Sequence, residues 1–346
     1  MSEIKLITGL WNLKDAYFPK NRGKVFSCFA CCGGSTMGYK LAGFDVIGCN
    51  EIDPKVFEIY KANHNPKYSF VMSIRDMLKK EDLPDELYNL DILDGSPPCT
   101  SFSTAGVRDR DWGKEKKFSE GQAYQRLDDL FFEFIAIAER LKPKIVVAEN
   151  VSGMLKGKAK GYIKEIVREY NRAGYITQLF RLNGANMGLP QARDRVFFVS
   201  YRKDLEFPKL RLSFNEKIIT FENVIEWTRY IQNDEFFPVS NTIKKYWKLT
   251  KQGEGFEKHH PKGSLFSHKK LDIKKPIRTL DSVGNLYHPT EERMISKNEL
   301  LAVSSFPMDM NWKDWKLSKK KWAMGMSVPP FMMQRIADQI YKQWLK

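Results

Sequence analysis

The sequence predicts an α/β protein with a mostly parallel β-sheet and a second, smaller and irregular domain. Short apolar runs alternate with segments of helical periodicity up to residue 201, a pattern typical of parallel sheets covered by helices. After this point the alternation ends, and residues 207–290 are rich in Lys, aromatic residues, Asn and Gly. We therefore expect a larger domain from residues 1–206 and 319–346, and a smaller one from residues 207–318.

The first strand and the turn that follows it lie within Lys24–Gly34, before a short helix that carries Met37 and Leu41. The next apolar run, Val46–Cys49, leads into Asn50-Glu51-Ile52-Asp53. Glycines let the backbone approach a ligand closely, and an acid at the end of the second strand accepts hydrogen bonds from ribose hydroxyls. This layout is typical of a nucleoside-binding βαβ unit.

The remaining elements of the larger domain follow from hydrophobic periodicity and from proline and glycine positions. Pro143 ends one helix, and Pro329-Pro330 precede the last one, which runs through Met333, Ile336 and Trp344. Helices are expected at 55–63, 125–141 and 158–173, and strands at 68–74, 91–94, 145–148, 175–182 and 196–201.

Cys99 follows the buried strand at 91–94 through the stretch Asp94-Gly95-Ser96-Pro97-Pro98. The two prolines restrict the backbone, and the carboxyl ends of strands are where α/β sheets place their ligands. A nucleophilic thiolate is one interpretation of Cys99. A small buried side chain is the other, and this stretch alone does not separate them.

Glu149-Asn150-Val151 comes at the carboxyl end of the strand at 145–148, so we expect its carboxylate at the same edge as Cys99. The alternative is that Glu149 or Asn150 caps a helix. A polar, basic loop at 100–124 follows Cys99 directly, and it could either close over a substrate or be a solvated charged loop.

The charge balance favours a polyanionic partner. The chain has 57 basic and 42 acidic residues, a net charge of +15, which points to nucleic acid. No apolar run is long enough to span a membrane, and the N-terminus has no apolar signal segment, so we expect a cytoplasmic protein. Cys28 and Cys31 form a CxxC pattern with no second pair to complete a zinc site, so we expect no metal.

Several motifs in one order, from about Val25 to Ala337, resemble the DNA cytosine-5 methyltransferases. The sharpest are Gly95–Cys99, which is similar to the family's Pro-Cys nucleophile motif, Glu149–Val151, and Gln191–Arg195, which matches Gln-x-Arg-x-Arg. The others are the cofactor loop Phe29–Gly34, the strand end Asn50–Asp53, Phe102-Ser103, the segment from Arg293 to Phe306-Pro307, and the closing motif Ser327–Pro330.

The resemblance implies a Rossmann-like methyltransferase fold with a small target-recognition domain, and S-adenosylmethionine as methyl donor. It implies that Cys99 adds to C6 of a flipped-out cytosine, that Glu149 binds the N3 and amino edge, and that Arg195 binds O2. Arg193 is expected to support the nucleophile loop or a phosphate. The implied cofactor residues are Phe29, Ala30, Cys32, Gly33, Gly34, Glu51, Ile52, Ile74, Pro97, Leu130, Ser327 and Val328.

The sequence departs from the family pattern at four positions. Ser27 stands where the family usually has an acid, and Cys31 replaces the first glycine of the cofactor loop. Ser73 stands where an Asp usually contacts adenine, and Met326 replaces the Asn before Ser-Val. Weaker cofactor binding or an altered donor pocket is a hypothesis that follows from these changes.

The expected partner is double-stranded DNA, with a cognate restriction endonuclease as a further possible partner and a monomer as the expected state. The compact size favours the prokaryotic or viral type of enzyme. Two alternatives share these residues: a tRNA cytosine-5 methyltransferase, and a catalytically weak DNA-binding subunit with impaired cofactor binding. The target sequence cannot be read from the irregular segment, because no code relates such segments to bases.

Overall fold

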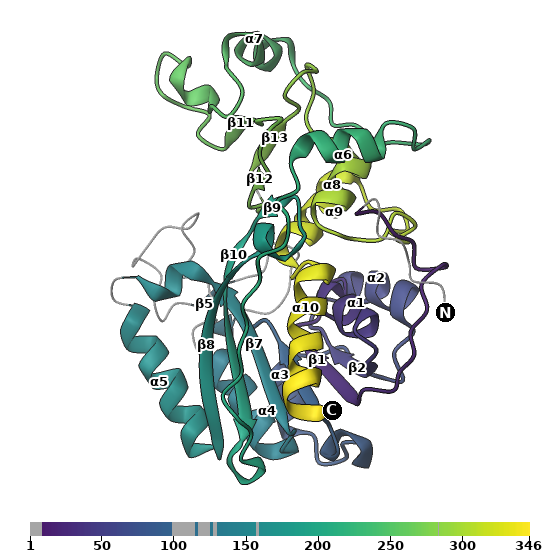
Figure 1. The fold of residues 1–346 in the computed structure, drawn as a ribbon, viewed down its shortest axis with the longest axis vertical. Helices are drawn as coiled ribbons and strands as arrows, with labels where there is room; N and C mark the ends of the chain where they lie inside the picture. Colours follow the sequence, from purple (N-terminus) through teal and green to yellow (C-terminus); the bar gives the residue numbers. More distant parts are fainter. Residues whose placement is uncertain (1–8, 99–114, 117–124, 127–129, 157–158, 283) are drawn as a thin grey trace. The chain divides into compact units, whose positions relative to one another are not determined.

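The structure is a computed structural model that describes residues 9–98, 115–116, 125–126, 130–156, 159–282 and 284–346 (Figure 1). The chain divides into two compact units. The sheet unit contains Phe18–Leu182, Asp194–Ser213 and Gln334–Lys346, and the loop-rich unit contains Met1–Tyr17, Asn183–Arg193 and Phe214–Met333. The loop-rich unit therefore begins and ends at other residues than the expected 207–318, and it includes a segment around Gln191.

The sheet unit is built on a seven-stranded sheet with the order β3-β2-β1-β4-β7-β10-β8. The pairs β1–β2, β1–β4, β2–β3 and β4–β7 are parallel, whereas β10 runs antiparallel to β7. The mostly parallel sheet is thus confirmed. The strands are β1 (Lys24–Cys28), β2 (Asp45–Asn50), β3 (Tyr68–Phe70), β4 (Ile92–Gly95), β7 (Ile145–Val151), β8 (Tyr175–Asn183) and β10 (Asp194–Arg202).

The parallel strands need helical crossovers, which the alternating pattern supplies. Asp53 caps α2 by accepting from the backbone N–H groups of Lys55 and Val56 at 2.8 and 3.3 Å. The helices of the sheet unit are α1 (Gly34–Leu41), α2 (Pro54–His64), α3 (Ile74–Lys79), α4 (Leu130–Leu141) and α5 (Ala159–Arg172), and α10 (Pro330–Ile340) contributes residues to both units.

Two expected elements are corrected by the structure. The strand expected at 68–74 ends at Phe70, because Ser73 caps a new helix, α3, by accepting from the backbone N–H of Asp76 at 3.1 Å. Of the helix expected at 125–141, the structure describes Leu130–Leu141 as α4, whereas Gln125–Arg126 form a strand, β6, that pairs with β5 (Glu115–Lys116). Helical periodicity alone does not reveal the cap at Ser73 or the pairing of residues 125–126.

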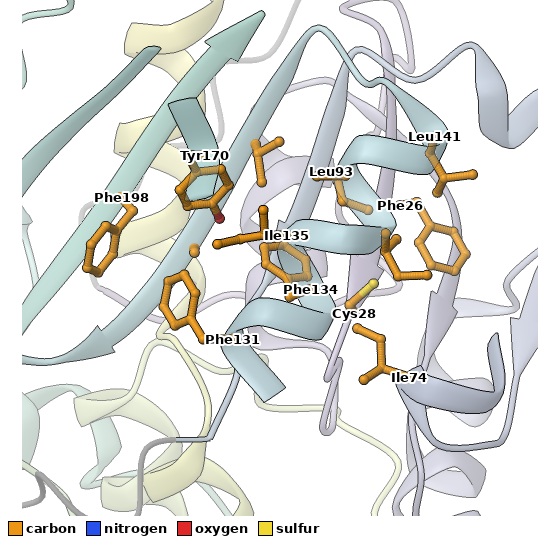
Figure 2. Packing of buried hydrophobic residues seen from close by; sticks show 14 of the residues in the cluster. Phe26, Cys28, Ile74, Leu93, Phe131, Phe134, Ile135, Leu141, Tyr170 and Phe198 are labelled. Carbon is orange, nitrogen blue, oxygen red and sulfur yellow. The ribbon is translucent and has the colours of Figure 1, made fainter. Parts of the chain in front are cut away.

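The core of the sheet unit lies between the sheet and α3, α4 and α5. Figure 2 shows Phe131, Phe134 and Ile135 of α4 in this cluster, together with Phe26 and Leu93 of the sheet. The ring of Phe131 packs edge-on against Phe198, with centroids 5.1 Å apart. Buried aromatic pairs of this kind fix the position of α4 against the sheet.

The loop-rich unit has little regular structure. The buried side chain of Gln191 links two other segments of this unit. The Nε2 of Gln191 donates to the carbonyl of Val303 at 3.0 Å, and its Oε1 accepts from the N–H of Leu280 at 3.0 Å. Its helices are α6 (Phe221–Thr228), α7 (Asn241–Leu249), α8 (Lys297–Val303) and α9 (Leu317–Met326), and its strands β9 (Gln191–Ala192), β11 (His268–Lys270), β12 (Ile277–Arg278) and β13 (Asn285–Tyr287). Within the described part of the chain, no helix has the length and apolarity to cross a membrane.

Candidate active site at the carboxyl edge of the sheet

The turn after β1 follows a left-handed path. Phe29, Cys31 and Gly33 have φ values of 52, 48 and 85°, a region that L residues rarely adopt. The N–H of Ala30 donates to the carbonyl of Asn50 at 3.1 Å, which fastens the turn to the neighbouring strand. A Cβ on Gly33 would overlap the imidazole of His64, so this position requires glycine. Cys31 keeps the left-handed backbone even though it carries a side chain.

Glu51 links the end of β2 to this turn. Its buried carboxylate accepts from the N–H of Cys31 at 2.8 Å and from the N–H of Asp53 at 3.0 Å. Burial raises the pKa of Glu51, and the backbone donors oppose that shift by favouring the charged form. The two backbone N–H groups therefore hold the carboxylate in one place beside the turn.

The turn that leads to Cys99 is anchored by a neighbouring strand. The Nδ2 of buried Asn150, on β7, donates to the carbonyl of Pro97 at 3.1 Å. A Cβ on Gly95 would press against the ring of Phe134. Cys99 itself lies outside the described residues, and so does most of the basic loop at 100–124. Sequence reasoning ascribed the rigidity of this turn to its prolines and missed the part played by Asn150.

Glu149 and Arg195 come together because β10 is antiparallel to β7. This direction brings the start of β10 to the carboxyl end of β7, with Arg195 in register with Val151 and Phe197 in register with Glu149. The Nε of Arg195 lies 2.7 Å from Oε1 of Glu149, and the two side chains are 13% and 10% exposed. The antiparallel pairing therefore brings a carboxylate and an arginine together at this edge of the sheet.

Arg193 has other partners than this pair. It belongs to the loop-rich unit, where it is almost fully buried. Its Nη1 and Nη2 donate to the carbonyls of Leu280 and Gly325, each at 3.1 Å. These contacts give Arg193 a role in holding the backbone of its own unit.

The other expected cofactor residues fall into two groups. In the sheet unit, Ile74 and Leu130 are buried within the core cluster, and Pro97 is buried in the turn before Cys99. In the loop-rich unit, Ser327 closes α9 through its Oγ, which donates to the carbonyl of Ala323 at 2.9 Å, and Val328 is buried. Met326 is half-exposed.

One buried acid at this edge was not singled out from the sequence as a site residue. Asp94, at the end of β4, is 2% exposed and lies in register with Ser27 of β1. The Oγ of Ser27 donates to its carboxylate at 2.9 Å. The signal was available, because Asp94 occupies the carboxyl end of a buried strand next to the cofactor loop. The sequence pattern alone indicates only that Asp94 begins the stretch that leads to Cys99.

The architecture places the chain in the class of α/β proteins with a Rossmann-like methyltransferase fold. A solved E. coli prophage protein described as a DNA modification methyltransferase superposes with a TM-score of 0.70 at 18% identity, covering 92% of this chain and 99% of that one. A DNMT2 variant from Spodoptera frugiperda gives 0.63 at 15% identity, covering 92% and 99%. At these identities the likeness shows the fold.

The family follows from the sequence match. The model of the C-5 cytosine-specific DNA methylases matches residues 23–342, and the chain belongs to this family. Type II methyltransferase M.NgoPII of Neisseria gonorrhoeae is 35% identical over 59% of this chain and 57% of its own length. M.FnuDI of Fusobacterium nucleatum is 37% identical over 54% and 50%. These matches span about half of each relative, whereas that to M1.HphI of Haemophilus parahaemolyticus, at 24% identity, covers 91% of this chain and 85% of the relative.

Proposed function

We propose that the chain is an S-adenosylmethionine-dependent DNA (cytosine-5) methyltransferase that acts on a cytosine flipped out of a specific duplex sequence. The observation that carries this proposal is the Glu149–Arg195 pair, 2.7 Å apart at the carboxyl edge of the sheet. Glu149 stands on the same strand as Asn150, which anchors the turn before Cys99. Family membership supports the same reaction.

In this proposal the thiolate of Cys99 adds to C6 of cytosine, which makes C5 electron-rich. C5 takes the methyl group, the C5 proton then leaves, and the C6–S bond breaks to return the thiolate. Glu149 holds the N3 and amino edge of the base, and Arg195 holds O2. Arg195 also contacts Glu149 directly, so the two side chains bind adjacent edges of one pyrimidine ring as a unit.

The residues at the edge of the sheet fit S-adenosylmethionine, which supplies an electrophilic methyl group when bound. The turn Phe29–Gly34 would lie against the ligand, and the fixed carboxylate of Glu51 suits a ribose. Ile52, Ile74, Pro97 and Leu130 would complete the pocket in the sheet unit. Ser327 and Val328 of the loop-rich unit are proposed as further cofactor residues.

Duplex DNA is the proposed substrate, and the loop-rich unit is the proposed target-recognition region. The helix α7 supports this assignment. Its Ile243, Tyr246 and Trp247 pack on a cluster around Phe256, while Lys245 and Lys248 are exposed. A surface hollow of about 580 Å³ runs along this lysine face. Such a face suits phosphate contacts, which give affinity without reading sequence. A cognate endonuclease as a further partner is in keeping with the Type II names of the relatives, and a monomer is proposed as the state of the chain.

The decisive experiment supplies the protein with methyl-labelled S-adenosylmethionine and either duplex DNA or tRNA, and then maps modified cytosines by bisulfite sequencing. Methylated cytosines within one DNA sequence are expected. Methylation of tRNA alone would replace DNA by RNA as the substrate. Specific DNA binding with no methyl transfer would instead support a catalytically weak DNA-binding subunit.

A second measurement tests the covalent step. DNA that carries 5-fluorocytosine at the target is expected to trap the enzyme as a stable adduct, because the fluorine cannot leave as the C5 proton does. Cys99→Ser is expected to form no adduct while still binding DNA. An active Cys99→Ser protein would overturn the mechanism.

A further inference from the structure

Asp94 and Ser27 form a buried polar pair across two central strands. They are in register on β4 and β1, and the Oγ of Ser27 donates to Oδ2 of Asp94 at 2.9 Å. The hydroxyl of Tyr39 on α1 donates to the other oxygen, Oδ1, at 3.4 Å. Hydroxyl groups thus donate to both carboxylate oxygens, which fixes the orientation of the Asp94 side chain.

This carboxylate has no cation beside it in the described part of the chain. Its neighbours there are the hydroxyls of Ser27, Tyr39 and Ser35, and the closest charged influence is the carboxylate of Glu149. Burial, reinforced by Glu149, raises the pKa of Asp94 to about 7. A buried carboxylate without a counter-ion is costly, so its presence calls for a reason.

The position of Asp94 supplies that reason. Ser27 lies one residue before the end of β1, where the left-handed turn begins, and Tyr39 belongs to the helix that follows this turn. Asp94 therefore stands next to the base of the cofactor turn, at the carboxyl end of adjacent parallel strands. In open α/β sheets this is the place where ligands bind.

We propose that the Asp94 carboxylate, oriented by Ser27 and Tyr39, is the counter-charge for the α-ammonium group of the bound cofactor. The inference rests on the proposed use of S-adenosylmethionine. The ammonium carries N–H donors that a carboxylate can accept, whereas the sulfonium carries none. The chain thus has an acid, Asp94 of β4, beside the cofactor loop, although the paired position on β1 is Ser27.

Ligands that lack successive charged parts of the cofactor separate the possible roles of Asp94. S-adenosylhomocysteine keeps the ammonium and loses the sulfonium charge, and 5′-deoxy-5′-methylthioadenosine lacks the amino-acid end altogether. The affinity of each is measured by calorimetry for the wild type and Asp94→Asn. The asparagine is nearly isosteric and can still bond Ser27 and Tyr39. We expect it to weaken S-adenosylmethionine and S-adenosylhomocysteine by at least about tenfold and to leave methylthioadenosine unchanged.

Each other outcome overturns the assignment. Equal affinities of the two proteins for S-adenosylmethionine would remove Asp94 from cofactor binding. Loss of all three ligands would mean that the residue only supports the fold. Loss of S-adenosylmethionine alone would assign the carboxylate to the sulfonium. A wild-type protein that binds none of the nucleosides would contradict the proposed function itself, which is a separate failure.

The pH dependence gives a second readout. Cys28 of β1, Tyr39 of α1 and Tyr60 of α2 also interact electrostatically with Asp94, but burial raises the pKa of each above its ordinary value, so they stay neutral from pH 6 to 8. Glu149 of β7 is the remaining acid. The wild-type affinity is expected to fall below about pH 7 as Asp94 is protonated, and above about pH 7.8 as the ligand's α-amino group is deprotonated. In Asp94→Asn the fall of affinity at acid pH (the acid limb) should disappear, whereas the fall at alkaline pH should remain.

Tyr39→Phe is the matched variant for positioning. It removes one hydroxyl from Oδ1 and leaves the charge of Asp94 in place. We expect a smaller loss of affinity than with Asp94→Asn, and an acid limb moved to higher pH because a hydrogen bond to the charged form is gone. An acid limb that stays where it is in the wild type would show that Asp94 is not the titrating group.

Discussion

Arg195 reaches Glu149 across a pair of antiparallel strands, with 2.7 Å between its Nε and Oε1 of the carboxylate. The contact depends on the reversed direction of β10, since a parallel β10 would carry Arg195 to the opposite edge of the sheet. Both side chains are largely buried, so neither charge is well solvated without the other. This pair is the best-defined part of the candidate active site.

Glu149→Gln and Arg195→Lys are expected to lower the rate of methyl transfer by at least about 100-fold. The glutamine cannot match the carboxyl group at the cytosine edge, and lysine lacks the planar fork of arginine. Single-turnover kinetics with saturating DNA measure the effect. Arg181→Lys is the control, because Arg181 forms an exposed ion pair with Asp194, and full activity is expected. Equal losses at Arg181 and Arg195 would contradict the assignment.

Asn150→Asp tests the anchor of the turn before Cys99. The aspartate keeps an oxygen for the N–H of Val151 and removes the Nδ2 that donates to the carbonyl of Pro97. We expect a reduced yield of the 5-fluorocytosine adduct and a loss of about 1–3 kcal/mol in the free energy of unfolding. Cofactor affinity is expected to stay near the wild-type value. An undiminished adduct would mean that the prolines alone hold the turn.

Gly33→Ala is expected to abolish cofactor binding and to destabilise the protein. The added methyl group would overlap the ring of His64, and the backbone φ of 85° disfavours alanine. Gly174→Ala is the matched control, because its φ is 90° and nothing lies within 4 Å of the added Cβ. The control should lose only about 1 kcal/mol in the free energy of unfolding and keep its affinity. Calorimetry and thermal melts provide both readouts.

Asp94 makes the stability of the fold depend on pH. Its pKa is raised from 3.8 to about 7, so between these values an unfolded chain has released the proton while the folded protein still holds it. The protonated form of Asp94 makes its full contribution to the free energy of unfolding below about pH 4, and this contribution is lost as the pH rises through 7. Asp94→Asn does not titrate, so its stability relative to the wild type should increase by up to about 4 kcal/mol from pH 4 to 8. Denaturant titrations at both pH values test this, and an unchanged difference would contradict it.

The exposed lysines of α7 are expected to contact DNA phosphates. Replacing Lys245 and Lys248 by Gln should flatten the dependence of log affinity on log salt by about 0.9 for each lost contact. Lys160 and Lys164, exposed on α5, serve as the control because the change in net charge is the same. Replacing Lys160 and Lys164 by Gln should lower the overall affinity for DNA slightly and leave the slope of log affinity against log salt unchanged. A slope that responds equally to both pairs would place the DNA elsewhere.

Much of the sheet unit could be predicted from local patterns. The strand at Lys24–Cys28, the turn with its glycines and the helix capped by Asp53 follow from apolar runs and turn residues that act over a few positions. The strand at Gln125–Arg126 and the early end of β3 could not be predicted in this way. They depend on the pairing of residues 125–126 with 115–116 and on the cap at Ser73.

The roles of the two arginines show where local reasoning stops. Arg193 and Arg195 are two residues apart in one motif, but the fold gives Arg195 to Glu149 and buries Arg193 against carbonyls of the loop-rich unit. Neighbouring residues on an extended strand point to opposite faces, and those two apart to the same face, so local geometry does not separate this pair. The separation arises because the chain changes units between them.

The sequence by itself determined the family, the mostly parallel sheet, and the acids and glycines of the carboxyl edge, because motifs and hydrophobic periods are properties of short segments. The tertiary structure decided which of these groups meet. It joined Glu149 to Arg195 through the direction of β10, and Asn150 to the turn before Cys99 through the β4–β7 pairing. It also set Asp94 beside Ser27, since the register between strands distant in the chain is fixed by packing of the whole sheet.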